Sequence, residues 1–172
     1  MEQRRKEKRK CLDITASKLL HSIETRSPVY VTIGTDQSMV ENWPFYIAKV
    51  NSVRKSKKKR RVGTGQRSFW YISRDEWYLN IVWLESKSVD DKWKLKLGKR
   101  DVCLLESLLI DPENDVVIEP VFDEGTLNVV PECVIDIQQK VESRYIFISR
   151  PINEECLINI MYMILLPHMM IG

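Results

Sequence analysis

The chain has 172 residues, of which 44% are hydrophobic and 9% aromatic, so it can bury one core. Its four cysteines are widely scattered and its basic start lacks an apolar stretch, which argues against a secreted, disulfide-stapled domain and predicts a reducing compartment. The net charge of +3 hides an asymmetry: residues 1–61 hold 16 Lys/Arg against 6 Asp/Glu, whereas residues 101–139 hold 10 Asp/Glu and neither Lys nor Arg.

This asymmetry leaves two interpretations open. In the first, the basic half faces a polyanion that the acidic half repels; in the second, the two halves attract each other inside one fold.

Residues 1–27 form a predicted basic arm with a short helix. The charge run of residues 1–10 has no apolar partner after Met1, which is typical of a solvated arm or the frayed start of a helix. Apolar residues from Leu12 to Ile23 then recur at helical spacing, and Pro28 ends this helix near Glu24.

After Pro28 the apolar spacing changes from helical to alternating. Strands are predicted at residues 29–33 and 45–50, and residues 52–68 are predicted to be a long exposed loop because their composition cannot bury itself. Further strands, or apolar runs that a core would bury, are predicted at 69–72, 78–84, 93–97, 102–110, 116–122, 127–130, 134–137 and 145–148.

Short strands with frequent turn signals and no helical crossovers favour a mainly β fold. We predict a small SH3-like β-barrel over residues 28–148, preceded by the short N-terminal helix and followed by an apolar C-terminal helix. The last segment, residues 149–172, is apolar but is interrupted by Asn159 and by Pro167. A helix packed on the barrel is the first interpretation, and a membrane anchor, an exposed partner-binding helix or an effect of truncation are the alternatives.

The sequence shows no arrangement typical of catalysis, of a metal site or of a bound cofactor. The histidines are only His21, in the predicted helix, and His168, in the apolar segment. No Cys-x-x-Cys pair exists, and Gly63-x-Gly65 lacks the rest of a phosphate-binding loop. We therefore predict a protein that is not an enzyme, with no catalytic residues, no metal and no cofactor.

A dense basic run gives the strongest local signal. Such a run can be read by nuclear import receptors or can lie beside nucleic-acid phosphates, and both interpretations predict a nuclear protein. A solvated loop without a partner is the third interpretation. The predicted contact residues are Arg54, Lys55, Lys57, Lys58, Lys59, Arg60 and Arg61.

Nine aromatic residues gather between positions 43 and 83, and most are expected in the core. A few could instead form an open cage for a methylated lysine, whose quaternary ammonium group binds aromatic faces. The cage candidates are Trp43, Phe45, Trp77 and Trp83.

The segments Val29–Val31, Pro44–Val50 and Ile81–Leu84, in this order and spacing, resemble the opening of a bromo-adjacent homology domain and, more loosely, Tudor-type barrels. The resemblance spans residues 28–137 in pattern and about 15 residues in motif. It implies an SH3-like barrel that binds chromatin, and in some members an aromatic cage for methylated lysine. The Trp-Phe/Tyr-Arg-Pro stretch usual after the third strand is replaced here by Trp83-Leu84-Glu85-Ser86.

We therefore predict a nuclear, chromatin-associated binding module whose partners are histone segments, DNA or RNA backbone, or an unknown nuclear protein. Neither a small-molecule substrate nor a membrane is expected as a partner. Two alternatives stay open: an accessory domain of a nucleic-acid enzyme or mobile element, and a membrane-tethered adaptor held by the C-terminal segment.

Overall fold

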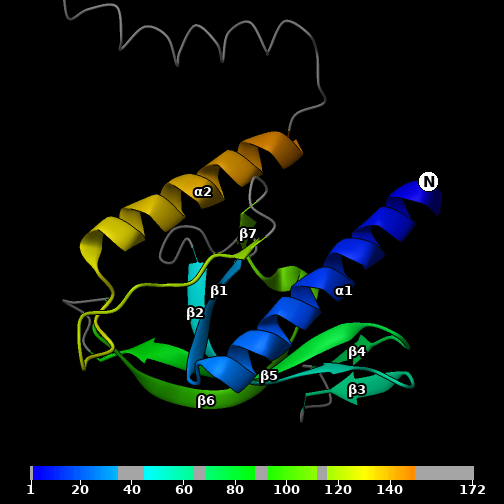
Figure 1. Cartoon of the computed structure of the whole chain (residues 1–172), viewed down its shortest axis with the longest axis horizontal. Coiled ribbons are helices and arrows are strands. Elements are labelled where there is room, and N and C mark those ends of the chain that lie inside the picture. The colour runs from blue at the N-terminus through cyan, green and yellow to red at the C-terminus, as the bar shows by residue number, and fades with distance from the viewer. Residues whose placement is uncertain (1, 35–44, 64–68, 88–92, 112–115, 150–172) are drawn as a thin grey trace, which may run out of the picture.

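The computed structural model describes residues 2–34, 45–63, 69–87, 93–111 and 116–149. Two long helices flank a twisted antiparallel sheet (Figure 1). The elements in chain order are α1 (Glu2–Thr25), β1 (Val29–Gly34), β2 (Phe45–Lys55), β3 (Arg60–Val62), β4 (Trp70–Ile72), β5 (Trp77–Ser86), β6 (Leu95–Leu104), the 3-10 helix η2 (Leu105–Ser107), β7 (Ile110–Asp111), β8 (Val116–Val117) and α2 (Pro131–Ser149).

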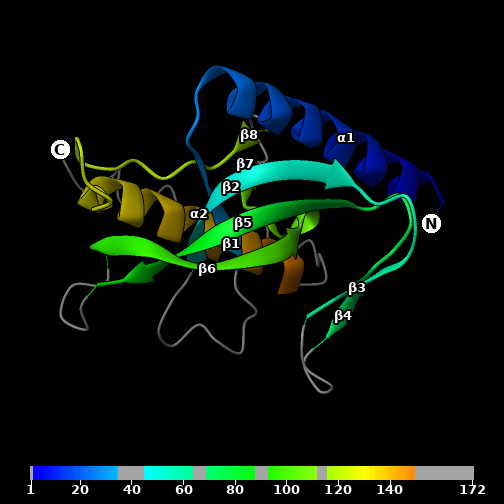
Figure 2. The same cartoon turned by 90° about the horizontal axis from the view of Figure 1, so that it is seen from below.

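The main sheet has the strand order β1-β2-β5-β6, and every neighbouring pair is antiparallel. The strands β2 and β5 are connected by the short hairpin of β3 and β4, which projects away from the sheet (Figure 2). The register of β2 and β5 shifts between Val50 and Ser52, so a bulge lies midway along this ribbon. The mainly β fold predicted from the sequence is confirmed.

The helix α1 covers one face of the sheet. Its buried residues Ala16 and Leu19 pack in one apolar cluster with Val31 of β1, Val50 of β2 and Ile81 of β5. The alternation of β2 explains this choice, because Ala48 and Val50 point to the α1 face while Phe45 and Ile47 belong to a second cluster.

The second cluster is closed by α2. Val134, Ile137 and Val141 are spaced to lie on one helical face, and they are buried together with Phe45 and Leu95. The strands predicted at residues 134–137 and 145–148 are therefore wrong, because both segments are turns of α2. Pro131 suits the first helical position, where no backbone N–H is needed.

Irregular chain covers parts of both edge strands, but the described strands do not close into a barrel. At β1, the Thr32 amide donates to Ile118 O at 3.2 Å, and Thr32 O accepts from the Leu109 amide at 3.0 Å. At the start of β6, the Leu95 amide donates to Leu127 O at 3.1 Å. The segment that follows η2 therefore bonds to both edges of an open sheet.

Two further boundaries differ from the sequence prediction. The helix α1 begins at Glu2, so the charge run of residues 1–10 is helical from its second residue, as the high helix propensity of Glu, Gln, Lys and Arg allows. The predicted loop 52–68 is wrong for the residues that belong to β2 and β3.

The predicted C-terminal helix belongs to the segment 149–172; Ser149 is the last residue of α2, and residues 150–172 lie outside the described residues. Within the part of the chain that the structure describes, neither helix combines the length and the apolar character that a membrane crossing would need.

Candidate nucleic-acid interface

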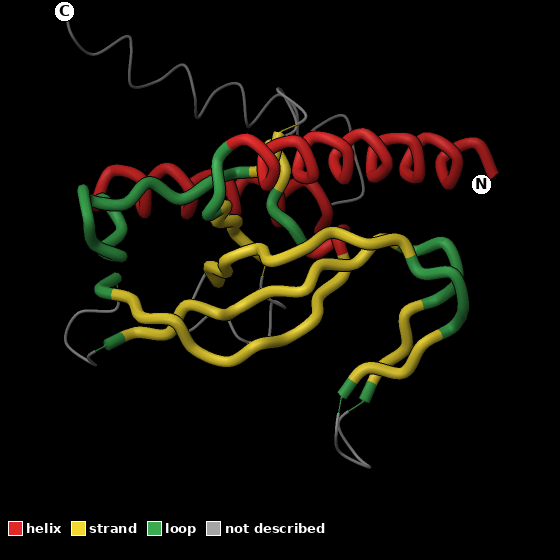
Figure 3. Tube along the Cα trace, turned by 60° about the horizontal axis from the view of Figure 1, so that its bottom comes forward, coloured by secondary structure: helices red, strands yellow, loops and turns green. Residues whose placement is uncertain are grey.

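A projecting hairpin (residues 56–63 and 69–76; Figure 3) carries most of the predicted basic run. We call this hairpin the arm, and from here on the word no longer refers to the N-terminal segment of residues 1–27. Ser56 fixes its root: the Ser56 amide donates to Glu76 O at 2.9 Å, and Ser56 O accepts from the Asp75 amide at 2.8 Å. The Ser56 hydroxyl donates to Lys58 O at 2.7 Å, and Asp75 takes the left-handed conformation with φ 67°. These bonds continue the ladder of β2 and β5 into the arm, so its cations are carried on ordered backbone.

The inner face of the arm packs on the sheet. Val62 and Ile72 form a small buried cluster with Tyr78, and Val102 and Leu104 of β6 pack against it. Arg60 shares this side: its Nη1 donates to the Tyr78 hydroxyl at 3.2 Å, and its guanidinium carbon lies 5.3 Å from the centroid of that ring. The arm therefore has its own apolar anchor besides the root.

The outer face of the arm alternates cations with aromatic rings. The guanidinium carbon of Arg61 lies 4.1 Å from the Phe69 ring centroid, and Lys59 Nζ lies 4.6 Å from that of Tyr71. The two rings meet edge to face, with centroids 5.6 Å apart. Phe69 is 42% exposed and Tyr71 48% exposed, so each ring presents area to solvent despite its cation.

The predicted contact residues are exposed, whereas Ser56 within the same run is buried. Exposed cations on a narrow ribbon can approach phosphates, and among them Arg60 already bonds to the buried Tyr78. The structure brings together, on β2, β3 and the turn between them, the residues Arg54, Lys55, Lys57, Lys58, Lys59, Arg60 and Arg61.

A cluster of three side chains links α1 to the base of the arm. Asp13 Oδ1 accepts from the Trp77 indole N–H at 2.6 Å and pairs with Lys55 Nζ at 2.9 Å. The ammonium of Lys55 also lies 5.2 Å from the centroid of the Trp77 ring. The hydrogen bond from Trp77, followed by that from Lys55, holds the pKa of the Asp13 carboxyl below its usual value.

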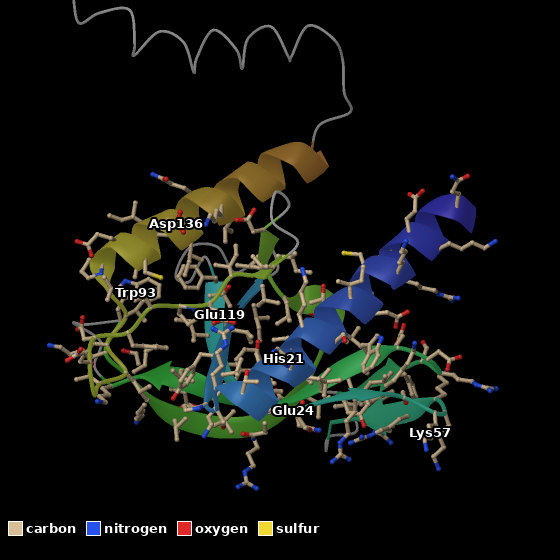
Figure 4. The ribbon with its side chains drawn as sticks, in the orientation of Figure 1. His21, Glu24, Lys57, Trp93, Glu119 and Asp136 are labelled. Carbon is tan, nitrogen blue, oxygen red and sulfur yellow. The ribbon has the colours of Figure 1, made fainter. Side chains whose placement is uncertain are left out.

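The first turns of α1 lie at the same end of the molecule as the arm (Figures 1 and 2). The exposed side chains of Lys6, Arg9 and Lys10 add positive charge there, and Lys8 pairs with Glu106 at 2.6 Å. A groove of about 580 Å³ separates α1 from the base of the arm. On the opposite side of the molecule lies α2 with Asp136, far from Lys57 (Figure 4). The basic and acidic stretches are not wholly apart, because Lys8 pairs with Glu106 and Arg26 pairs with Glu119, so both interpretations of the charge asymmetry keep support.

The structure does not bring together the three predicted cage residues that it describes, Phe45, Trp77 and Trp83. Phe45 is fully buried in the α2 cluster and stacks on Trp93 at 5.2 Å, while Trp77 and Trp83 border the α1 cluster. Trp83 lies six positions after Trp77 on β5, a distance of roughly 20 Å along a strand. Trp43 lies outside the described residues.

Trp83 does line a groove of its own, of about 510 Å³, together with Tyr46, Glu85 and Lys99. The Trp83 indole N–H donates to Asp101 Oδ2 at 2.9 Å, and its ring meets Tyr46 edge to face at 5.8 Å. Two aromatic rings, the Glu85 carboxylate and the Lys99 ammonium thus border the same groove.

Neither a metal site nor a reactive Cys103 thiol is indicated within the described ranges. No group of three or more His, Cys, Asp and Glu side chains there could hold a metal ion. Burial, assisted by Asp101, raises the pKa of the Cys103 thiol to about 12, so this thiol stays protonated at neutral pH.

Comparisons with protein-family models, with curated proteins and with solved structures found no match for this chain.

Sequence reasoning did not single out the two rings of the outer face. Phe69 and Tyr71 stood among nine aromatics that were mostly assigned to the core. Their alternation with Trp70 and Ile72 was a usable signal, because in a strand it sends Phe69 and Tyr71 to one face and the other two to the opposite face. Which face is wet depends on contacts with β6, which no local pattern reveals.

Proposed function

We propose that this chain is a non-enzymatic, chromatin-associated binding module of the nucleus whose arm contacts nucleic-acid phosphates. The observation that carries the proposal is the surface of the arm, where exposed cations stand on β3 and on the turn that leads into it, in a hairpin whose root is held by the bonds of Ser56. Phosphate contacts from such cations release counterions, so the affinity depends steeply on salt and little on base sequence. The basic first turns of α1 lie at the same end and add to the attraction.

The test replaces Lys57, Lys58 and Lys59 by glutamine and measures binding to unrelated DNA and RNA oligonucleotides by fluorescence anisotropy between about 50 and 200 mM salt. If all three lysines contact phosphates, the slope of log affinity against log salt should fall by about 2 to 3.

The matched control replaces Lys94, Lys96 and Arg100 of the β6 region, which changes the net charge by the same amount. An equal loss of affinity in both variants would contradict the proposal, because it would show a general charge effect in place of a site on the arm.

Recognition by an import receptor is the other predicted use of the basic run. Arg60 and Arg61 are paired with Ile72 and Tyr71 in the hairpin, so a receptor that needs an extended, unpaired peptide would have to open the arm. The residues of the turn, Lys57 and Lys58, carry no such restriction. Nuclear accumulation of a fluorescent fusion, with and without the triple glutamine substitution, tests this use separately.

The groove beside Trp83 supports a second binding function, the capture of a methylated lysine. A quaternary ammonium can rest against the Trp83 and Tyr46 rings, and the Glu85 carboxylate adds attraction. Trp83→Ala should abolish binding of a trimethyllysine peptide while Leu97→Ala, an exposed apolar change on β6, should preserve it. Calorimetry with the unmethylated peptide as reference measures this; equal binding of both peptides would contradict a methyl-specific site.

We also propose that the chain is related to SH3-like modules of the bromo-adjacent homology or Tudor type. Support for an SH3-like, bromo-adjacent homology or Tudor-like relationship comes from the antiparallel succession of β1, β2 and β5 and from the segment after η2, which bonds to both sheet edges. The accessory role beside a nucleic-acid enzyme, the membrane-tethered role and an unknown nuclear partner remain alternative predictions.

A further inference from the structure

The outer face of the arm carries more than charge, because a purely electrostatic surface needs no aromatic rings in water. Phe69 and Tyr71 are large side chains that expose 42% and 48% of their area, although the inner face of the same hairpin offers a buried cluster. Each ring alternates with a cation that is within reach of it, Arg61 at 4.1 Å and Lys59 at 4.6 Å. Exposed rings interleaved with cations are the features by which proteins bind unpaired bases together with their phosphates.

We infer that the outer face, formed by Lys59, Arg61, Phe69 and Tyr71, binds single-stranded nucleic acid in preference to duplex. This inference rests on the proposed function and names its substrate class. Bases stack on the exposed area of the two rings and on the guanidinium plane of Arg61, while the ammonium of Lys59 and the turn lysines neutralise the backbone.

The spacing of the rings favours a strand whose bases have separated. Phe69 and Tyr71 have centroids 5.6 Å apart and meet edge to face. Bases stacked in a duplex follow each other at about 3.4 Å, so neighbouring bases can reach both rings only after they unstack. A paired base in a duplex also keeps its faces covered by its neighbours, which leaves the rings no partner there.

The geometry of the hairpin supports the same assignment. Arg61 pairs with Tyr71 in the register of β3 and β4, and Val62 with Trp70. Because Val62 and Ile72 are buried on the inner face, a rotation of the hairpin that would hide the rings would expose its apolar anchor. The rings are therefore held in water by the packing of their neighbours.

The experiment measures binding of a 20-nucleotide oligo(dT), an oligo(U) of equal length and a mixed-sequence duplex by anisotropy at fixed salt. The full chain should bind both single strands more tightly than the duplex. The variant Phe69→Leu/Tyr71→Leu keeps apolar area but removes both aromatic faces. Its affinity for each single strand should fall, relative to the unchanged chain, by at least about fivefold for each ring removed, whereas its affinity for the duplex should stay within about twofold. Comparison of the two single strands shows whether DNA or RNA is preferred.

Leu97→Ala serves as the matched control, because Leu97 is 54% exposed on β6 and lies outside the arm. Thermal unfolding of each variant verifies the fold. The inference would be overturned if the unchanged chain bound the duplex more tightly than the single strands, or if the variant Phe69→Leu/Tyr71→Leu kept its single-strand affinity. In either case the triple glutamine variant still tests the proposed function on its own. Absence of binding to all three probes at low salt would overturn both.

Discussion

The two ends of β5 hold tryptophans in the same way but surround them differently. The indole N–H of Trp77 donates to Asp13, and that of Trp83 donates to Asp101. At the arm end the ammonium of Lys55 lies over the Trp77 ring, whereas at the other end the Trp83 ring borders an open groove. A tryptophan whose face is already covered by a lysine supports the arm, and one that faces a groove can receive a cation from a ligand.

The largest effect should come from the core at the groove end. Leu84 is buried in the α2 cluster, so Leu84→Ala removes methyl groups from a site that six other core residues of the sheet and α2 share. The free energy of unfolding should fall by about 2–5 kcal/mol. Chemical denaturation measures it, and a loss below about 1 kcal/mol would show that this end is not part of the cooperative core.

A cavity created by substitution at the arm end should destabilise the arm more than the rest of the sheet. Ile72 is fully buried but belongs to the small cluster with Val62 and Tyr78. Ile72→Ala should therefore speed amide exchange of Arg61 and Tyr71 by at least about tenfold, through opening of the arm, and lower global stability less than Leu84→Ala does. Hydrogen exchange read by mass spectrometry tests this, and uniform acceleration across the whole sheet would erase the distinction between the two ends.

A smaller and pH-dependent effect should follow from Asp13→Asn. The pKa of Asp13 lies below its unperturbed value of 3.8, so the charged carboxylate contributes stability above that pH and loses it as the pH falls toward the lower folded pKa. Because Asp13 is half exposed, its contribution should not exceed about 1 kcal/mol.

Thermal unfolding measured from neutral pH to below pH 3.8 compares this variant with the unchanged chain. The Asp13→Asn variant should be less stable than the unchanged chain at neutral pH and equally stable at the acid limit. Asp123→Asn, in an exposed turn, serves as the control. A difference that persists at the acid limit would show that the charge of Asp13 is not what links α1 to Trp77.

The smallest effect on stability should come from Gly98→Ala at the groove end. A β-carbon at residue 98 would meet the carboxyl end of Glu85, which is exposed and free to rotate away. Stability should change by less than about 1 kcal/mol, whereas the groove loses its acidic wall and binds a trimethyllysine peptide more weakly. Glu85→Gln keeps the shape without the charge, and unchanged peptide affinity in both variants would remove Glu85 from the proposed site.

Much of the sheet could be predicted because its strands alternate over several residues. The strands at 29–33, 45–50, 69–72 and 78–84 are found within a residue or two of their predicted bounds, apart from the extension of β2 to Lys55. The extension departs from the prediction because a lysine-rich composition is typical of an exposed loop, although a ribbon with one solvent-facing side also accepts such residues.

The helix α2 shows where local reading fails. The four residues from Val134 to Ile137 are too short to separate period two from helical spacing, whereas the longer interval that includes Val141 favours a helix begun by Pro131. The contacts of the candidate sites are harder still to predict from local sequence. Asp13 and Trp77 are 64 positions apart, so nothing short of the assembled fold places them in contact.

The brevity of the arm limits how it can be used. Each of its strands has three residues, which corresponds to a footprint of roughly 10 Å, enough for two or three nucleotides. Under the proposed function, a platform of this size would hold a strand only briefly, so useful occupancy would require a second attachment that raises the local concentration of the same strand. The proposed interface therefore suits a chain that is tethered near a nucleic acid by other means, and avidity rather than intrinsic affinity would set its residence time.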